Sequence, residues 1–268
     1  FKANGNICAM TGDGVNDAPA LKQANIGIGM GSGTDVAKDA AAMVLTDDNF
    51  ATIVNAIEIG RTVYSNIKKS ITYLLAGNLE AIIAIVFAVV MNWENPFTTL
   101  QLLFINLIND SLPAIALAFE AAEPDTMNKP PRDINEGILQ GGTSAVILIR
   151  GIIISIAVIF SQYLGNKVSP VLGASMAFST ITLSRIFQTL PARSDNVSIF
   201  KIGVVKNKHV LGAIFICLVL YFIVLLPGLR EIFSIPNYFG LREFAICILL
   251  ALISTALMEL IKVFKNRI

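Results

Sequence analysis

Two carboxylates lie four residues apart in a glycine-rich segment near the start of the chain, TGDGVNDAP from Thr11 to Pro19. They are Asp13 and Asp17, and the amide Asn16 lies between them. The segment follows an apolar run that predicts a strand, and acidic groups after a parallel strand suit Mg²⁺, which prefers oxygen ligands. A ligand-free turn rich in Asp and Asn explains the same spacing equally well, so spacing alone leaves both interpretations open.

Glycines and a helix start supply the remaining features of this candidate site. Gly12 and Gly14 flank Asp13 and let the backbone approach a ligand closely. A predicted helix opens directly after the loop, and exposed N–H groups at a helix start favour a phosphate. If the loop binds a ligand, Thr11, Gly12 and Asp13 are the residues expected to hold a phosphate group together with Mg²⁺; a ligand-free turn stays the alternative.

Polar side chains within long apolar segments form a second candidate site. Asn106, Asn109 and Asp110 are spaced i, i+3 and i+4, which predicts that they share one helical face. Pro113 follows and can free backbone carbonyls for other partners. An acid, two amides and free carbonyls suit a hard cation. An interhelical hydrogen-bond network without an ion is the alternative, but it does not easily explain the intramembrane Asp110.

Three further residues bear on this cation site. Asn78 and Glu80 add an amide and an acid, but residues two apart on a regular helix point in different directions. Arg185 lies between Ser184 and Ile186 in another apolar segment. A fixed cation beside a two-ion cavity would take the place of one ion. The alternative is an arginine whose side chain snorkels to the membrane interface.

The elements that must position the first site alternate between strands and helices. Short apolar runs predict strands at Ile7–Met10, Ile26–Met30 and Met43–Leu45, with helices over Asn16–Ala24 and Thr34–Ala42 between them. This order predicts a partial parallel α/β unit over residues 1–60. About sixty residues make only half of such a domain, so we expect the other half upstream and interpret the chain as a fragment.

The remainder, residues 61–268, has the pattern of a polytopic membrane domain. The chain of 268 residues is 54% hydrophobic and only 15% charged. A helix is predicted from Phe50, capped by Asn49, to about Val90; it would join the α/β unit to the bilayer and span it after Lys69. Five further apolar spans make six, at about 98–119, 141–163, 170–190, 209–227 and 242–262.

Charge sets the expected orientation and the expected partners. Lys and Arg gather in the connectors after the second and fourth spans and at the C-terminus, which predicts a cytosolic C-terminus and a cytosolic α/β unit. The net charge of +1 gives no case for a nucleic-acid partner. The expected partners are a transported cation, the lipid bilayer and the upstream part of the same protein.

The segment TGDGVNDAPAL closely resembles the hinge motif of P-type ATPases, which belong to the haloacid dehalogenase-like phosphotransferases. The resemblance continues through IGIGMGSGTDVAK, VLTDDNF, GRTVYSNIKK, LLFINLINDSLPAIAL and MNKPPR. It implies the C-terminal portion of a calcium-pump-like ATPase of a bacterial plasma membrane, with ATP and Mg²⁺ as cofactors. It also implies that Asp13 ligates Mg²⁺ while Asn16 and Asp17 steady the phosphoryl group.

Other parts of that family's machinery lie outside this sequence. The resemblance places the phosphorylated aspartate and the nucleotide domain upstream, so we expect no ATP turnover by this chain alone. Two rival classes are a passive channel or carrier, which needs no TGDGVNDAP loop, and a membrane-tethered phosphatase, which needs neither Glu80 nor Asp110.

Departures from the calcium-pump pattern bear on the transported ion. In those pumps an Asn and a Glu lie three residues apart, whereas Ala81 stands three residues after Asn78 here. Asn109 replaces the family's usual Thr, and Arg185 stands where animal calcium pumps place a glutamate. We predict Ca²⁺ export with one ion per cycle. A monovalent cation or a proton is the alternative, because proton pumps carry an order similar to Asn78-Leu79-Glu80.

Overall fold

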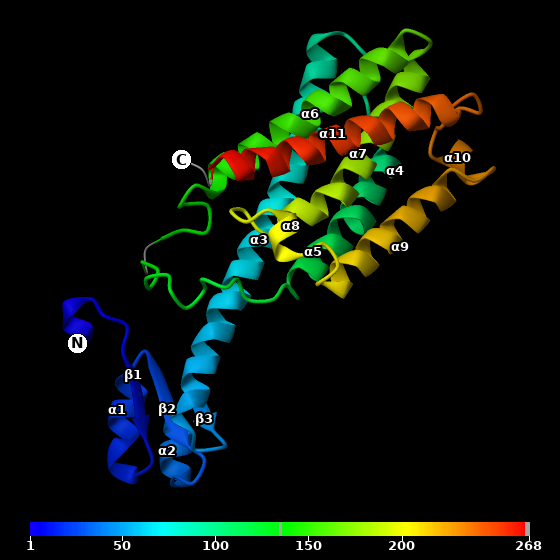
Figure 1. The fold of residues 1–268 in the computed structure, drawn as a ribbon. Helices are drawn as coiled ribbons and strands as arrows, with labels where there is room; N and C mark the ends of the chain where they lie inside the picture. The colour runs from blue at the N-terminus through cyan, green and yellow to red at the C-terminus, as the bar shows by residue number, and fades with distance from the viewer. Residues whose placement is uncertain (134–135, 266–268) are drawn as a thin grey trace. The chain divides into compact units, whose positions relative to one another are not determined.

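A computed structural model describes residues 1–133 and 136–265 of the chain. The chain divides into two compact units (Figure 1). The first comprises Phe1–Arg61 with Pro124–Met127, and the second comprises Thr62–Glu123 with Asn128–Ile268.

The first unit is built on a three-stranded parallel sheet in the order β1-β2-β3. Strands β1 (Ala9–Gly12), β2 (Ile26–Met30) and β3 (Met43–Leu45) alternate with helices α1 (Ala18–Gln23) and α2 (Asp35–Ala40). The predicted parallel α/β arrangement is confirmed. The first strand begins two residues later than predicted, because the backbone N–H of Cys8 donates to the side chain of Asn25 instead of joining the ladder.

Two glycines explain how both helices pack on the same face of β2. Gly27 and Gly29 alternate along the strand and therefore point to one side of the sheet. A Cβ on Gly27 would lie 2.4 Å from the carbonyl oxygen of Leu21 in α1, and one on Gly29 would lie 3.3 Å from the Cβ of Ala41, just after α2. The absence of side chains here lets the helices approach the strand closely.

Helix α3 runs without interruption over Phe50–Val90, as the sequence predicts. Asn49 caps it, since its side-chain oxygen accepts a hydrogen bond of 2.9 Å from the N–H of Ala51. Its membrane-level half buries mainly small residues, which allow neighbouring helices to come close. These small buried residues are Ala76, Gly77, Ala84 and Ala88.

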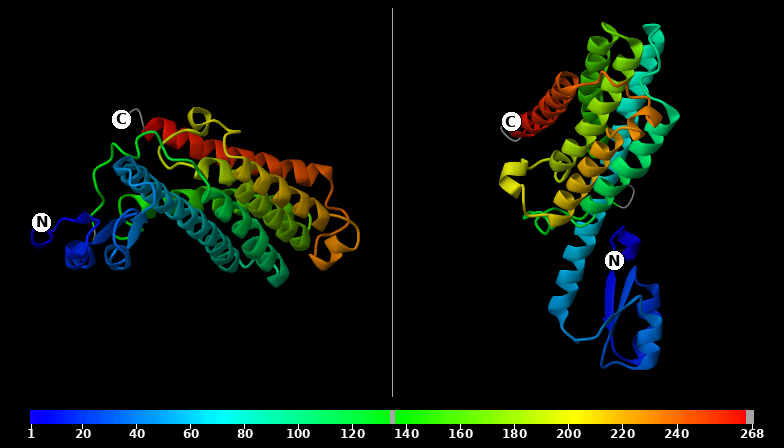
Figure 2. Two further views of the ribbon diagram at one scale, coloured as in Figure 1. Left: turned by 90° about the horizontal axis from the view of Figure 1, so that it is seen from below. Right: turned by 90° about the vertical axis from the view of Figure 1, so that its right-hand side faces the viewer.

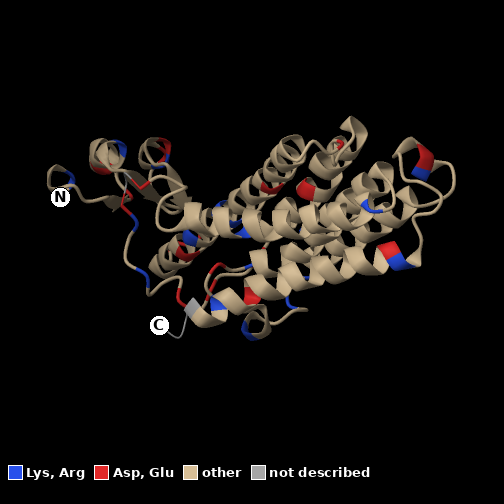
Figure 3. Cartoon of the chain, turned by 90° about the horizontal axis from the view of Figure 1, so that it is seen from above, with Lys and Arg blue, Asp and Glu red and all other residues tan. Residues whose placement is uncertain are grey.

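The second unit is helical, and charged residues are sparse along its helices (Figure 3). After α3 come α4 (Thr99–Phe104), a π-helical segment (Ile105–Asp110), α5 (Ser111–Leu117), α6 (Thr143–Asn166) and α7 (Pro170–Ala192). They are followed by α8 (Ile199–Ile202), α9 (Lys208–Val224), α10 (Leu229–Ile232) and α11 (Leu241–Lys265).

Five described helical segments are long and apolar enough to cross a membrane. They are Phe50–Val90, Thr99–Leu117, Thr143–Asn166, Pro170–Ala192 and Leu241–Phe264. The predicted fifth span corresponds to α9, which has only 17 residues and lies at the lower limit of spanning length. The structure therefore supports a multi-pass membrane protein, while a count of six spans stays a prediction.

Helix α7 occupies the centre of the helical unit. An apolar stretch of 18 residues within α7 is 78% buried, against 28% to 44% for the corresponding stretches of the other four candidate spans. Helices α6, α7 and α11 lie side by side, as the views in Figures 1 and 2 agree. A Cβ on Gly165 of α6 would lie 2.6 Å from the Cα of Gly173 in α7, so these two glycines permit a close contact between the helices.

A buried ion pair joins the ends of several helices of this unit. Arg193, 1% exposed, donates through Nε and Nη2 to the two carboxylate oxygens of Glu120 at 2.8 and 2.7 Å. Asn207 donates to the same carboxylate at 2.7 Å, and Asn66 of α3 donates to the carbonyl of Glu120 at 2.6 Å. Glu120 thus fixes the start of the loop that follows α5.

Removing one partner of this pair should destabilise the protein. Arg193→Met leaves the Glu120 carboxylate buried without its cation, and we expect a loss of about 3–5 kcal/mol. The melting temperature of the full-length protein in detergent measures it. The double variant Arg193→Met/Glu120→Leu should recover most of the loss, and the exposed Lys201→Met should have little effect. A single variant that melts like the wild type would contradict this role.

Candidate functional site

The loop after β1 places its two carboxylates in different roles. Asp13 directly follows the strand, as predicted, and its side chain is exposed. One oxygen of Asp17 accepts hydrogen bonds from the backbone N–H groups of Asp13 and Gly14 at 3.1 and 3.0 Å. Asp17 therefore shapes the loop, while Asp13 and the exposed Asn16 remain open to a ligand.

Glycine is required both just before Asp13 and in the neighbouring loop after β2. A Cβ on Gly12 would lie 2.5 Å from the Cβ of Asp17, and one on Gly33 would lie 2.9 Å from the carbonyl oxygen of Asp13. That same carbonyl accepts a hydrogen bond of 2.8 Å from the N–H of Thr34. The neighbouring loop thus holds the backbone of Asp13 in place. Thr11, the other predicted binding residue, is half-buried within β1.

Two further aspartates follow β3. Both carboxylate oxygens of Asp48 accept from the N–H of Ser32, at 3.2 and 3.1 Å. Hydrogen bonds from Ser32 hold the pKa of Asp48 below its usual value, and a hydrogen bond from Thr52 does the same for the pKa of Asp47. These acids tie loops together. Across residues 1–133 and 136–265, no cluster of three or more Asp, Glu, His or Cys side chains is arranged to hold a metal.

The centre of the helical unit contains a buried arginine bound to two carboxylates. Arg185 of α7 is 1% exposed. Its Nη1 lies 2.5 Å from each carboxylate oxygen of Asp110, its Nε donates to Glu80, and its Nη2 donates to the carbonyl of Gly77. Glu80 is fully buried and Asp110 is 4% exposed. The alternative in which Arg185 snorkels to an interface is therefore wrong, because its guanidinium is held among acids from two other segments.

Gly77 provides the space that Arg185 occupies. A Cβ at this position would lie 2.9 Å from the Cζ of Arg185 and 3.1 Å from both terminal nitrogens. Tyr73, Gly77 and Glu80 are spaced i, i+4 and i+7, so α3 presents all three on one face. The sequence prediction missed Tyr73 and Gly77, although this spacing relative to Glu80 could have indicated them.

A π-helical segment at Ile105–Asp110 positions the second carboxylate. Such segments are rare and occur often at functional sites. Pro113, four residues after Asn109, has no N–H to donate to the carbonyl of Asn109. The hydroxyl of Tyr73 lies 3.2 Å from this carbonyl and 3.2 Å from the carbonyl of Arg185. The predicted freeing of a carbonyl by Pro113 is thus consistent with the geometry, and a tyrosine is its partner.

The other predicted cation ligands divide into buried and exposed residues. Asn109 is buried and donates to the carbonyl of Thr182 at 3.0 Å, whereas Asn106 is exposed. Asn106 therefore does not lie on the buried side that holds Asn109 and Asp110, unlike the expectation for a regular helix. Asn78 is also exposed, on a different side of α3 from Glu80, as the two-residue spacing predicts.

Two oxygens near the arginine are buried without a hydrogen-bond partner. They are Oε2 of Glu80 and Oδ1 of Asn109. A buried acceptor without a partner is unfavourable by roughly 1–3 kcal/mol. Both atoms are ligands of the type that hard cations prefer. The centre therefore combines a fixed positive charge with oxygens that a cation or a proton could satisfy.

These features define a class of protein: a membrane protein that has a small parallel α/β unit and a buried carboxylate–arginine centre. Residues 94–264 match the family described as cation transporting ATPase, C-terminus, and residues 1–57 match the haloacid dehalogenase-like hydrolases. The chain belongs to the family of cation-transporting ATPases.

Similar proteins extend well beyond the length of this chain. A calcium-transporting ATPase of Listeria monocytogenes is 62% identical over 267 residues, which cover 100% of this chain and 30% of that protein. Calcium-transporting ATPase 1 of Lactococcus lactis is 62% identical over 97% of this chain and 30% of its own length. Calcium-transporting ATPase type 2C member 1 of Bos taurus is 40% identical over 87% of this chain and 25% of its own length. The chain thus spans less than a third of the length of these relatives.

The close fit between Gly77 and Arg185 can be tested by a single methyl group. Gly77→Ala should push the guanidinium away from its carboxylates and lower the stability of the full-length protein by about 1–3 kcal/mol, as overpacking does. The melting temperature measures this effect.

Gly60→Ala in the same helix is the matched control. A Cβ there would meet nothing within 4 Å, so only the gain in helix propensity should remain. Equal melting temperatures for Gly77→Ala and Gly60→Ala would show that the space around Arg185 is not tight.

Proposed function

We propose that this chain is the C-terminal part of an ATP-driven pump that exports Ca²⁺ through a phosphorylated aspartate. The observation that carries the proposal is the buried centre of Arg185, Glu80 and Asp110 in a chain that also holds the Asp13 loop. The names of the similar proteins support calcium as the ion. Uptake of ⁴⁵Ca²⁺ into vesicles bearing the full-length protein, dependent on ATP, is the direct test; ATP-driven uptake of Na⁺ or H⁺ alone would overturn it.

In the first unit, Asp13 is the proposed ligand of the catalytic Mg²⁺. Its exposed carboxylate after β1 fits a hard cation that keeps several waters. The metal, when bound, would offset the negative charge of the phosphoryl group. Asn16 is exposed beside it and would steady the phosphate, while Asp17 holds the loop in shape. ATP and the phosphorylated aspartate would be supplied by the upstream part of the protein.

In the second unit, the proposed cation site surrounds Arg185. The oxygens of Glu80 and Asn109 that have no partner, together with Asp110, would bind the ion after Arg185 moves away. The exposed Asn78 and Asn106 would contribute ligands where the upstream part of the protein contacts these helices. Glu80 would alternatively carry a proton, which keeps transport of a proton or a monovalent cation as the second candidate.

The orientation and boundaries are part of the same proposal. Residues 1–60 would complete a cytosolic phosphorylation domain, and residues 61–268 would form six spans with a cytosolic C-terminus in a bacterial plasma membrane. The distribution of Lys and Arg supports this orientation. Helix α3 would transmit changes at Asp13 toward Glu80, since it is one unbroken element of 41 residues.

Asp13→Asn in the full-length protein should reduce phosphoenzyme formation from ATP by orders of magnitude, because it removes a charged metal ligand. Radiolabelled phosphate incorporation at several Mg²⁺ concentrations measures this. Asp39→Asn, at an exposed carboxylate of α2, is the matched control. Normal phosphorylation with unchanged Mg²⁺ dependence in Asp13→Asn would contradict the role of Asp13.

The wild-type protein should bind one Ca²⁺ per phosphorylation site without cooperativity. Glu80 and Asp110 are the two carboxylates that contact Arg185 at this centre, and Ala81 offers no further carboxylate for a second ion. Equilibrium binding of ⁴⁵Ca²⁺ to purified full-length protein measures the number. Two ions per site, or a Hill coefficient clearly above one, would refute this stoichiometry.

A further inference from the structure

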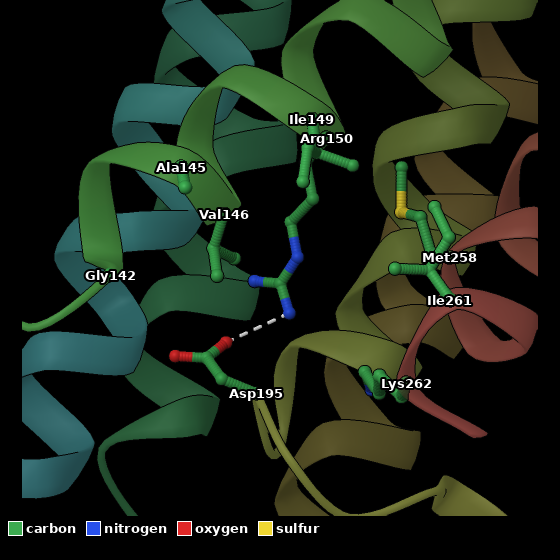
Figure 4. A pocket seen from close by; sticks show the side chains of 9 residues that line it. All are labelled: Gly142, Ala145, Val146, Ile149, Arg150, Asp195, Met258, Ile261 and Lys262. Atoms are coloured by element: carbon green, nitrogen blue, oxygen red, sulfur yellow. Dashed lines mark hydrogen bonds and ion pairs between the residues drawn. The ribbon is translucent and has the colours of Figure 1, made fainter. Parts of the chain in front are cut away.

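Two adjoining cavities lie where α6 begins, where α7 ends and where α11 ends. The apolar cavity, about 310 Å³, has walls of Ala145, Val146, Ile149, Met258 and Ile261 (Figure 4). The polar cavity, about 200 Å³, is lined by Lys68, Lys69, Glu123 and Lys129 among others. The two share Gly142, Val146 and Asp195, so they form one continuous depression. All of these residues belong to the second unit.

Two buried basic side chains, Arg150 and Lys262, line the apolar cavity. Arg150 is 3% exposed and donates through Nη2 to Asp195 at 2.9 Å, while its Nη1 is buried without a hydrogen-bond partner. Lys262, 5% exposed, lies 2.7 Å from Glu259. Both Arg150 and Lys262 also donate to the carbonyl of Pro191, at 3.4 and 2.5 Å. Their charges are therefore close enough together for a single phosphate to contact both.

The charge of the combined depression is positive. Burial by itself would raise the pKa of Glu123, but Lys69, at 3.1 Å, brings that pKa below its usual value, so Glu123 is ionised. Glu123 and Asp195 are the two acids that line the described walls. Five basic residues line the same walls, and they are Lys68, Lys69, Lys129, Arg150 and Lys262.

The backbone adds to this preference for an anion. Helix α6 has 24 residues and begins after Gly142, and the N–H groups of Thr143 and Ser144 donate to the carbonyls of Gln140 and Leu139. The positive end of the helix dipole at this start favours negative charge. Arg150 lies seven residues after Thr143, or about 10 Å along the helix axis, which suits the depth between headgroups and acyl chains.

The open apolar wall indicates what kind of anion fits. Ile149 and Ile261 line the cavity and remain 42% and 40% exposed, although both belong to helices that cross the membrane. Such a surface contacts acyl chains. A soluble phosphate would satisfy the basic residues but would leave this wall uncovered. A phospholipid satisfies both, with its phosphate near Arg150 and Lys262 and its chain along the apolar wall.

We propose that this depression is a binding site for one anionic phospholipid of the leaflet in which α6 begins and α11 ends. The lipid phosphate would accept a hydrogen bond from the unpartnered Nη1 of Arg150. The glycerol headgroup of the lipid would face the lysines of the polar cavity. This lipid site rests on the part of the proposed function that places the chain across a membrane, and it does not depend on which ion is transported.

Native mass spectrometry of the full-length protein tests the proposal, with phosphatidylglycerol and phosphatidylcholine of identical acyl chains added in equal amounts. Wild-type protein should retain one phosphatidylglycerol in preference to phosphatidylcholine by about tenfold, as expected for one or two basic contacts. Arg150→Gln/Lys262→Gln should bring this ratio close to one. Lys201→Gln/Lys206→Gln removes two exposed positive charges outside the cavities and should leave the ratio unchanged.

A second variant separates lipid binding from the integrity of the ion pairs. Ala145→Trp fills the apolar cavity and leaves Arg150, Asp195 and Lys262 untouched, and it should also abolish the preference. Equal retention of both lipids by the wild type, or an undiminished preference in both cavity variants, would overturn the proposal. Displacement of the lipid by millimolar glycerol phosphate would likewise overturn it, since the cavity would then take a soluble anion.

Discussion

Arg185 cannot be buried without negative charge beside it, and much of the helical unit is arranged to meet that requirement. An isolated charge in such a setting costs several kcal/mol even after relaxation. Glu80 on α3 and Asp110 at the end of the π-helical segment bring carboxylates to the guanidinium, while Gly77 gives it room. Three segments distant in sequence are thereby fixed together by one side chain. A transported cation that needs the same oxygens must compete with this arginine.

This competition gives the proposed transport cycle a physical basis. With Arg185 in place, both carboxylates are paired with its guanidinium, whose positive charge opposes the entry of a cation. In the proposed cycle, an ion would enter when α3 or the segment after α4 shifts enough to separate the acids from the guanidinium. Because α3 is continuous from Phe50 to Val90, a displacement at its start would be carried along a single rigid element. The arginine would then re-pair with the carboxylates after the ion leaves.

Much of this arrangement was predictable from local patterns in the sequence. Alternating apolar runs and turns predicted the parallel sheet, and Asp13 lies directly after β1 because a loop rich in Gly and Asp ends that strand. The uninterrupted helical pattern predicted α3, and Asn49 caps it. The opposite directions of Asn78 and Glu80 followed from their two-residue spacing alone.

The remaining features depended on contacts that no local pattern contains. A regular helix was assumed over residues 105–110, where the structure has a π-helical segment in which Asn106 is exposed and Asn109 is buried. The role of Arg185 could not be read from its own segment, since its partners are 75 and 105 residues away. The ties of Asp17 to the backbone of its own loop were likewise hidden, because the same spacing suits a metal ligand.

The affinity of the full-length Arg185→Met protein for Ca²⁺ tests the central claim most directly. Methionine keeps much of the side-chain volume but removes the charge that competes for Glu80 and Asp110. If Arg185 holds these carboxylates in the ion-free state, the dissociation constant should fall by at least about tenfold, because the ion no longer has to displace a paired cation. An unchanged or weaker affinity, in a variant that still forms phosphoenzyme from inorganic phosphate, would contradict the account.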